Sequence, residues 1–156
     1  MNMDAKELIA DIAKRIGLEY DGGDTFSFEA DGLVVAISSL PELDAVALTG
    51  DVGEPPPERL EGLYKTLLGA NHFFGGTAGA TISLDPDNGR IALCRALPLV
   101  TLDGEKFYAE VERFVNTAET WAKVVADYRG AAAEAPDEGA AEERPALFGA
   151  GGFMQV

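Results

Sequence analysis

The sequence contains only one cysteine, Cys94, and only one histidine, His72. One cysteine cannot form an internal disulfide, and one residue of each kind cannot supply the four ligands of a structural zinc site. We therefore expect neither a disulfide framework nor a metal centre, and no other pattern in the sequence points to a cofactor.

Basic residues are also scarce, since 12 Lys and Arg stand against 27 Asp and Glu, for a net charge of −15. Phosphate backbones and anionic lipid surfaces are bound by clustered Lys and Arg, so we expect no binding to nucleic acid or to a membrane surface. A strongly acidic chain stays dissolved while it exposes apolar surface to a partner, although solubility alone would also explain the charge.

Long apolar runs are missing too, because no stretch approaches the roughly 20 residues that span a bilayer. The first stretch, MNMDAKELIADIAKR, carries acidic residues and lacks the apolar centre of a secretory signal. We therefore expect a cytoplasmic protein without membrane insertion. The length of 156 residues suggests one folded domain.

Hydrophobic periodicity predicts helices and strands in the order α-βββ-α-ββ-α. The expected helices lie over 4–16, within 53–76 and from Asp103 to Gly130; the expected strands lie over 25–30, 33–40, 44–52, 77–85 and 90–99. Pro57 suits the first turn of the second helix, and Pro86 to Gly89 suit a hairpin turn. The fold class is therefore α+β, with a largely antiparallel twisted sheet flanked by helices. Three helices cannot cover both sheet faces fully, so some apolar surface should remain for a partner.

A change in composition divides the chain into a domain of residues 1–129 and a tail of residues 130–156 rich in Ala, Gly and Glu. We expect the tail to be flexible. Its apolar residues Leu147, Phe148, Phe153 and Met154 are unusual for a purely solubilising segment. They could dock on a dimer of this chain or on a bound protein, and disorder is the alternative.

The sequence contains little evidence of a catalytic site. Cys94 lies in the alternating run RIALCRALPL, where Arg95 points to the opposite face and cannot activate the thiol. His72 lies near a predicted helix end, and no third residue completes a Cys94–His72 pair. Asp85, Asp87 and Asn88 resemble half of a calcium loop without its glycine and glutamate, and a hairpin turn explains them better. We expect a protein that is not an enzyme.

One long segment, SLDPDNGRIALCRALPLVTLDGEKFYAEVERFVNTAETWAKVV, resembles the class I type III secretion chaperones of the Tir-chaperone-like (CesT) family. In that family a hairpin of similar pattern leads through a short linker into an amphipathic helix. The matching residues are Leu84, Asp85, Gly89, Ile91, Leu93, Leu97, Pro98 and Leu99, followed by Phe107, Val111, Phe114, Val115, Ala118 and Trp121. With the order of elements, the likeness covers residues 4–128.

The resemblance implies a homodimer that binds the extended N-terminal segment of a secreted effector, keeps it soluble and export-competent, and uses no ATP. It also implies possible contact with the export apparatus. The dimer interface would involve Leu60, Leu63, Leu67 and Ile82. The effector-binding residues would be Leu8, Ile9, Ile12, Phe26, Phe28, Val35 and Ile37. Two alternatives are a bacterial adaptor or sensory domain of related fold acting outside secretion, and a small hydrolase that uses Cys94.

Overall fold

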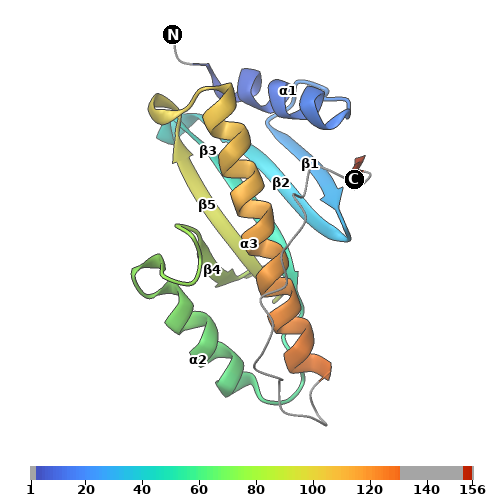
Figure 1. Cartoon of the computed structure of the whole chain (residues 1–156), viewed down its shortest axis with the longest axis vertical. Helices are drawn as coiled ribbons and strands as arrows, with labels where there is room; N and C mark the ends of the chain where they lie inside the picture. Colours follow the sequence, from blue (N-terminus) through green and yellow to red (C-terminus); the bar gives the residue numbers. More distant parts are fainter. Residues whose placement is uncertain (1–2, 131–152, 156) are drawn as a thin grey trace.

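A twisted antiparallel sheet forms the centre of the protein (Figure 1). The computed structural model describes residues 3–130 and 153–155. Within them the strands are β1 (Thr25–Ala30), β2 (Leu33–Leu40), β3 (Ala45–Gly53), β4 (Thr81–Leu84), β5 (Ile91–Pro98) and β6 (Phe153–Gln155). They lie in the order β4-β5-β3-β2-β1-β6, and every neighbouring pair is antiparallel. The predicted α+β class and largely antiparallel sheet are confirmed.

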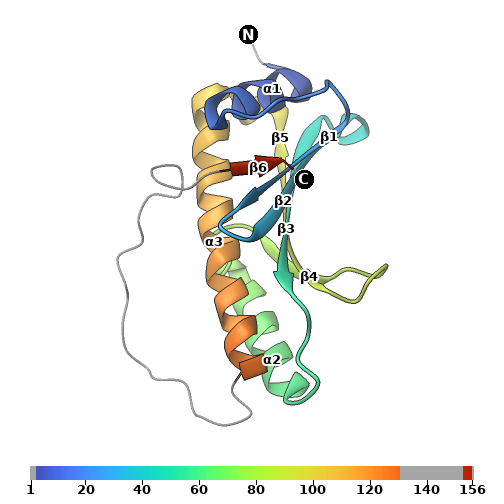
Figure 2. The same cartoon turned by 90° about the vertical axis from the view of Figure 1, so that its right-hand side faces the viewer.

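Three α-helices accompany the described part of the sheet: α1 (Ala5–Ile16), α2 (Leu60–Asn71) and α3 (Gly104–Gly130). Short 3₁₀ turns η1 (Pro41–Leu43), η2 (His72–Phe74) and η3 (Leu99–Thr101) connect elements. Figure 2 shows α3 along one face of the sheet, with α1 across its upper end and α2 beside its lower half. Asp103 caps the N-terminus of α3, because its carboxylate accepts the Lys106 N–H at 2.8 Å.

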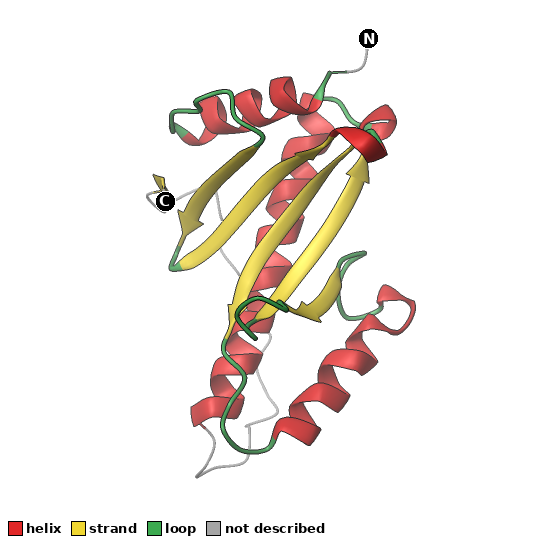
Figure 3. Ribbon diagram, turned by 180° about the vertical axis from the view of Figure 1, so that it is seen from behind, coloured by secondary structure: helices red, strands yellow, loops and turns green. Residues whose placement is uncertain are grey.

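The core lies between α3, α1 and one face of the sheet. Phe107, Val111, Phe114 and Ala118 of α3 are buried there, as their three- and four-residue spacing predicts. Gly50 of β3 allows this close approach, since a Cβ at that position would lie 3.3 Å from side-chain atoms of both Phe114 and Ala118. The opposite face of the sheet carries no helix among the described residues, as Figure 3 shows. The expectation that the helices would leave sheet surface uncovered is therefore confirmed.

The start of the second helix differs from its prediction. The helix begins at Leu60, after Arg59 in the left-handed conformation with φ 65°. Pro55 to Pro57 therefore precede the helix, and Pro57 does not occupy its first turn. Three prolines in a row favour extended backbone, because each proline disfavours the helical conformation in the residue before it.

Most of the predicted tail, residues 131–152 and 156, lies outside the described residues. The flexible character predicted for them, and the division into residues 1–129 and 130–156, therefore stay predictions. Phe153–Gln155 are an exception, because they form β6 at the edge of the sheet.

Arg15 joins the C-terminal end of α1 to the first turn of α3. Its guanidinium donates to the Asp11 carboxylate at 2.8 Å and to the Glu105 carboxylate at 2.6 Å. It also lies 5.2 Å from the centre of the Tyr108 ring. The hydrogen bond from Arg15 lowers the pKa of the Glu105 carboxyl below its ordinary value near 4.5.

This lowered pKa predicts a pH-dependent contribution of Glu105 to stability. The contribution is present above the ordinary pKa and disappears as the pH falls below it, because the folded protein then has to bind a proton against the Arg15 charge. Glu105→Gln should lower the melting temperature at pH 7 by about 1–3 °C, given how weak exposed ion pairs are. The difference from wild type should shrink toward zero at pH 3.

Thermal unfolding followed by circular dichroism from pH 7 to pH 3 measures this effect. Glu61→Gln is a suitable control, since Glu61 pairs with Lys65 at 3.0 Å within α2 and joins no separate elements. A Glu105→Gln difference that does not change with pH would contradict the assignment.

Candidate protein-binding surfaces

Large apolar side chains are exposed on α2 and its neighbours. We call this surface the α2 patch; its members are Leu60, Leu68, Phe73, Phe74 and Leu84. Leu68 is 69% exposed and Phe73 is 88% exposed, values that are unusual for large apolar residues unless a partner covers them. Its members lie on α2, on the turn η2 and on the edge strand β4.

The helix α2 carries two neighbouring apolar stripes. Leu63 and Leu67 are buried against the core, whereas Leu60 and Leu68 lie eight residues apart on a stripe that faces outward. An apolar arc this wide cannot be covered by α3 alone. The second stripe is therefore available to another surface.

Of the four residues predicted for a dimer interface, the structure exposes only Leu60. Leu63, Leu67 and Ile82 are at most 6% exposed and belong to the core of a single chain. The interface itself stays a prediction. The burial of these three residues has a simple cause, because sequence periodicity identifies the apolar face of a helix but not which part of a wide face its own chain covers. The sequence signals for the exposed surface were Leu68, which directly follows Leu67, and the aromatic pair Phe73 and Phe74.

The turn that presents Phe73 and Phe74 is held by three side chains. The Trp121 indole donates to the Gly76 carbonyl at 2.9 Å, and Arg95 donates to the Ala78 carbonyl at 3.0 Å. Asn71 bonds both the N–H and the carbonyl of Ile82. Phe73, Phe74 and Ala78 all have positive φ, with values of 49°, 55° and 51°. Because such backbone costs energy for these residues, the surrounding bonds must hold it in place.

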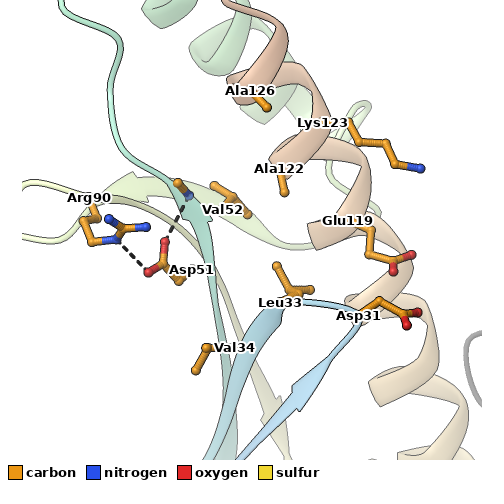
Figure 4. Close-up of a pocket in the computed structure, with 12 residues that line it drawn as sticks. Asp31, Leu33, Val34, Asp51, Val52, Arg90, Glu119, Ala122, Lys123 and Ala126 are labelled. Carbon is orange, nitrogen blue, oxygen red and sulfur yellow. Dashed lines mark hydrogen bonds and ion pairs between the residues drawn. The ribbon is translucent and has the colours of Figure 1, made fainter. Parts of the chain in front are cut away.

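A second surface is a groove beside the turn between β1 and β2 (Figure 4). Its volume is about 460 Å³, and the β1–β2 turn, the end of β3 and the C-terminal half of α3 line it. Val34 is 40% exposed and provides apolar surface there, together with Ala122 and Ala126. Asp31, Glu119 and Lys123 also line the groove, so its walls offer both apolar and charged contacts.

An ion-pair network fixes the β3 wall of this groove. Asp51 accepts from Arg90 at 2.7 Å and from the Gly53 N–H at 3.0 Å, and both bonds are drawn in Figure 4. Arg90 also donates to Glu54 at 2.9 Å. The bond with Asp51 raises the pKa of the Arg90 guanidinium. A bulge between Asp51 and Gly53 interrupts the regular pairing of β3 with β5 at this network.

The edge of β1 is a third surface. There β6 pairs antiparallel with β1, with Phe28 opposite Gln155, Glu29 opposite Met154 and Ala30 opposite Phe153. The residues between α3 and this strand are 131–152, so the pairing joins the end of the chain to its first strand.

All seven residues predicted to bind an effector lie in the core, and none is more than 2% exposed. They are Leu8, Ile9 and Ile12 of α1, Phe26 and Phe28 of β1, and Val35 and Ile37 of β2. The structure brings them together as one cluster under α1 and the β1 end of the sheet. In this single chain their side chains are buried beneath the surface around the β1 edge. They are not themselves exposed on that surface.

The two candidate catalytic residues have separate surroundings. Cys94 is half-buried on β5, and its sulfur lies 3.8 Å from the Ser83 hydroxyl. The His72 ring packs edge-on against the Phe73 ring, with centres 4.7 Å apart. Among the described residues, no group of three or more His, Cys, Asp or Glu is arranged to hold a metal ion. Nor does any helix in residues 3–130 combine the length and apolar character that a bilayer crossing requires.

Taken together, the fold and surfaces define a small α+β protein-binding module: one sheet face is covered by helices, and apolar surface is exposed on α2 and beside β2. The chain belongs to the Tir chaperone protein (CesT) family, whose model matches residues 7–122. The resemblance inferred from the sequence is thereby confirmed. A comparison with curated protein sequences gives no match.

Solved structures share this fold. The crystal structure of the ExsC–ExsE complex matches with 24% identity and a TM-score of 0.66, covering 79% of this chain and 97% of that one. The HopA1–SchA chaperone–effector complex matches with 17% identity and a TM-score of 0.58, covering 76% and 92%. The ExoU–SpcU complex from the type III secretion system of Pseudomonas aeruginosa matches with 18% identity and a TM-score of 0.58, covering 74% and 92%.

Proposed function

We propose that the protein is a homodimeric chaperone that binds the N-terminal segment of a type III secreted effector and keeps it soluble and export-competent. The observation that carries this proposal is the family match over residues 7–122. Among the solved structures with the same fold, one is a chaperone–effector complex and another is a complex from a type III secretion system. The exposed apolar surfaces of this chain fit a protein whose partner is another polypeptide.

The α2 patch supports the homodimer. A two-fold interface brings the same surface of both copies together, so one apolar patch is sufficient to form it. Leu68, Phe73 and Phe74 are the members with the greatest exposure, and the η2 turn presents the two phenylalanines. In this arrangement Leu63, Leu67 and Ile82 contribute by holding α2 and β4 in position from the core.

The groove beside β2 and the edge of β1 support cargo binding in extended form. An extended peptide can add a strand at a sheet edge and place alternate side chains into adjacent apolar hollows. Val34 offers such a contact in the groove, and the predicted effector-binding residues of α1, β1 and β2 form the packed base beneath the edge. The acidic charge of the chain favours cargo segments that carry basic residues beside apolar ones.

The proposal includes no catalytic step and places the protein in the bacterial cytoplasm. A chaperone of this type works by covering cargo, and the ordering cost falls on the flexible cargo segment when it binds. Cys94 then serves as a small packing residue on β5. Cys94→Ala should accordingly leave cargo binding intact.

Co-expression with the N-terminal segments of proteins exported by the same secretion system tests the function. Segments of roughly 100 residues are long enough to wrap a small dimer. Val34→Asp should weaken the complex about tenfold, because it puts a charge into the apolar part of the groove. Affinity is measured by isothermal titration with the purified segment.

Val100→Asp is the matched control, since Val100 is 69% exposed on η3, outside the groove. Equal losses for both variants would argue against the groove as the cargo site. If no exported protein forms a stable complex and a non-exported protein does, the adaptor alternative replaces the chaperone function.

A further inference from the structure

The two edges of the sheet are covered in different ways. At the β4 edge, the Asn71 side chain accepts the Ile82 N–H at 2.8 Å and donates to the Ile82 carbonyl at 3.0 Å. This amide takes the hydrogen-bonding position that the backbone of another strand would have. The β4 edge is therefore guarded, in that its backbone groups at Ile82 are already paired, by a residue only eleven positions away in the chain. At the β1 edge the guard is β6, which follows α3 only after residues 131–152. Unguarded edges pair readily with other chains.

We propose that β6 is an internal substitute for a cargo strand: it pairs with β1 in the empty protein and is displaced when a cargo segment pairs with the same edge. This inference rests on the proposed function, because it assumes an extended cargo segment. It assigns the last residues of the chain to regulation of the cargo site.

The pairing of β6 is short enough to be replaced. It covers Phe28–Ala30, whereas β1 starts at Thr25 and has six residues. A cargo strand that also pairs along Thr25–Ser27 would form more backbone hydrogen bonds than β6 does. It can begin on that part of the edge and then take over the positions held by β6, so the exchange does not require the edge to be bare first.

The connection to α3 is long enough for this arrangement. At about 1.5 Å per residue, α3 is roughly 40 Å long, and Figure 2 shows β6 well above the C-terminal end of that helix. Residues 131–152 can span about 70 Å when extended, at 3.3–3.6 Å per residue. A tethered strand also remains at an effective concentration of roughly millimolar after release. A three-residue strand can thus guard the edge without high intrinsic affinity and return when cargo leaves.

A competing internal strand lowers the apparent affinity for cargo by the fraction of molecules in which the edge is open. In the empty protein it also prevents edge-to-edge pairing between copies. The consequence is a chaperone that discriminates against segments able to form only short strands.

The full-length variant Phe153→Pro/Met154→Pro tests the proposal. Successive N–H groups of a strand point to opposite sides, so one of these two residues donates to β1 and the double substitution removes that bond. The control is Gly149→Pro/Ala150→Pro, which adds two prolines outside β6. The probe is a fluorescent synthetic peptide of residues 147–156, added in trans and followed by anisotropy.

The peptide should bind the Phe153→Pro/Met154→Pro variant at least about tenfold more tightly than wild type or the control, because only this variant has a vacant edge. Hydrogen exchange of Phe28–Ala30 should accelerate in the same variant, while exchange in α3 stays unchanged. Equal peptide binding by all three proteins, or unchanged exchange at Phe28–Ala30, would overturn the assignment of β6 as a guard of the edge.

A cargo segment identified by co-expression supplies the last comparison, and the variant should bind it about 3- to 10-fold more tightly than wild type. Unchanged cargo affinity together with a positive peptide result would overturn the competition between β6 and cargo. Failure to find any cargo would contradict the proposed function instead, and the peptide and exchange results would still report on the edge.

Discussion

The Leu68→Asp variant is expected to be a monomer at concentrations where the wild-type protein is a dimer. Leu68 is 69% exposed on the outward stripe of α2, and a carboxylate there would have to be buried in the apolar contact between copies. Loss of the leucine contact and burial of the charge together cost about 3 kcal/mol, which raises the dissociation constant roughly 100-fold. Light scattering coupled to size exclusion, over a range of protein concentrations, measures this change.

Leu43→Asp is a closely matched control for this prediction. Leu43 is 70% exposed, lies on η1 and is not part of the α2 patch. The same substitution at the same exposure should leave the dimer intact. Equal dissociation of both variants, or a dimeric Leu68→Asp protein with native circular dichroism, would show that the α2 patch is not the interface.

Phe114→Ala should have the largest effect on stability. Phe114 is 2% exposed, and its ring lies against Gly50, where α3 closely approaches β3. Removing a buried phenylalanine ring typically costs about 3–5 kcal/mol through lost burial and the cavity left behind. For a domain of this size the melting temperature should fall by roughly 10–20 °C.

This measurement is best made in the Leu68→Asp background, so that dissociation of a dimer does not contribute to the unfolding transition. Phe73→Ala is the matched control, since Phe73 is 88% exposed. It should change the free energy of unfolding by less than about 0.5 kcal/mol. A small effect of Phe114→Ala would mean that α3 packs on the sheet differently from the structure described above.

Local signals in the sequence were sufficient for most of the secondary structure. Asp4 and Gly17, which bound α1, are a capping residue and a left-handed glycine, and both act over a single turn. Alternation predicted β1 over Thr25–Ala30 and β2 over Leu33–Leu40 with the bounds that the structure has. The second helix was located less well, because Pro57 was expected in its first turn and the helix begins only at Leu60.

The binding surfaces could be predicted only in part. The sequence showed that α2 is apolar over a wide arc, but the share of that arc taken by α3 depends on how the two helices lie against each other. For the same reason the effector-binding residues inferred from the family pattern were found in the core. The family pattern shows only that these positions are apolar. An apolar residue can be buried within its own chain or against a partner, and the pattern does not distinguish the two.

The sequence by itself determined the class of the protein, the order and bounds of most elements, the acidic charge and the family likeness. Each of these depends on residue type and on spacing along one segment. Only the tertiary structure decided that Leu68, Phe73 and Phe74 face outward, that Asn71 guards β4, and that Phe153–Gln155 pair with β1. These are relations between segments far apart in the chain or between competing faces of one helix, and packing of the whole domain settles them.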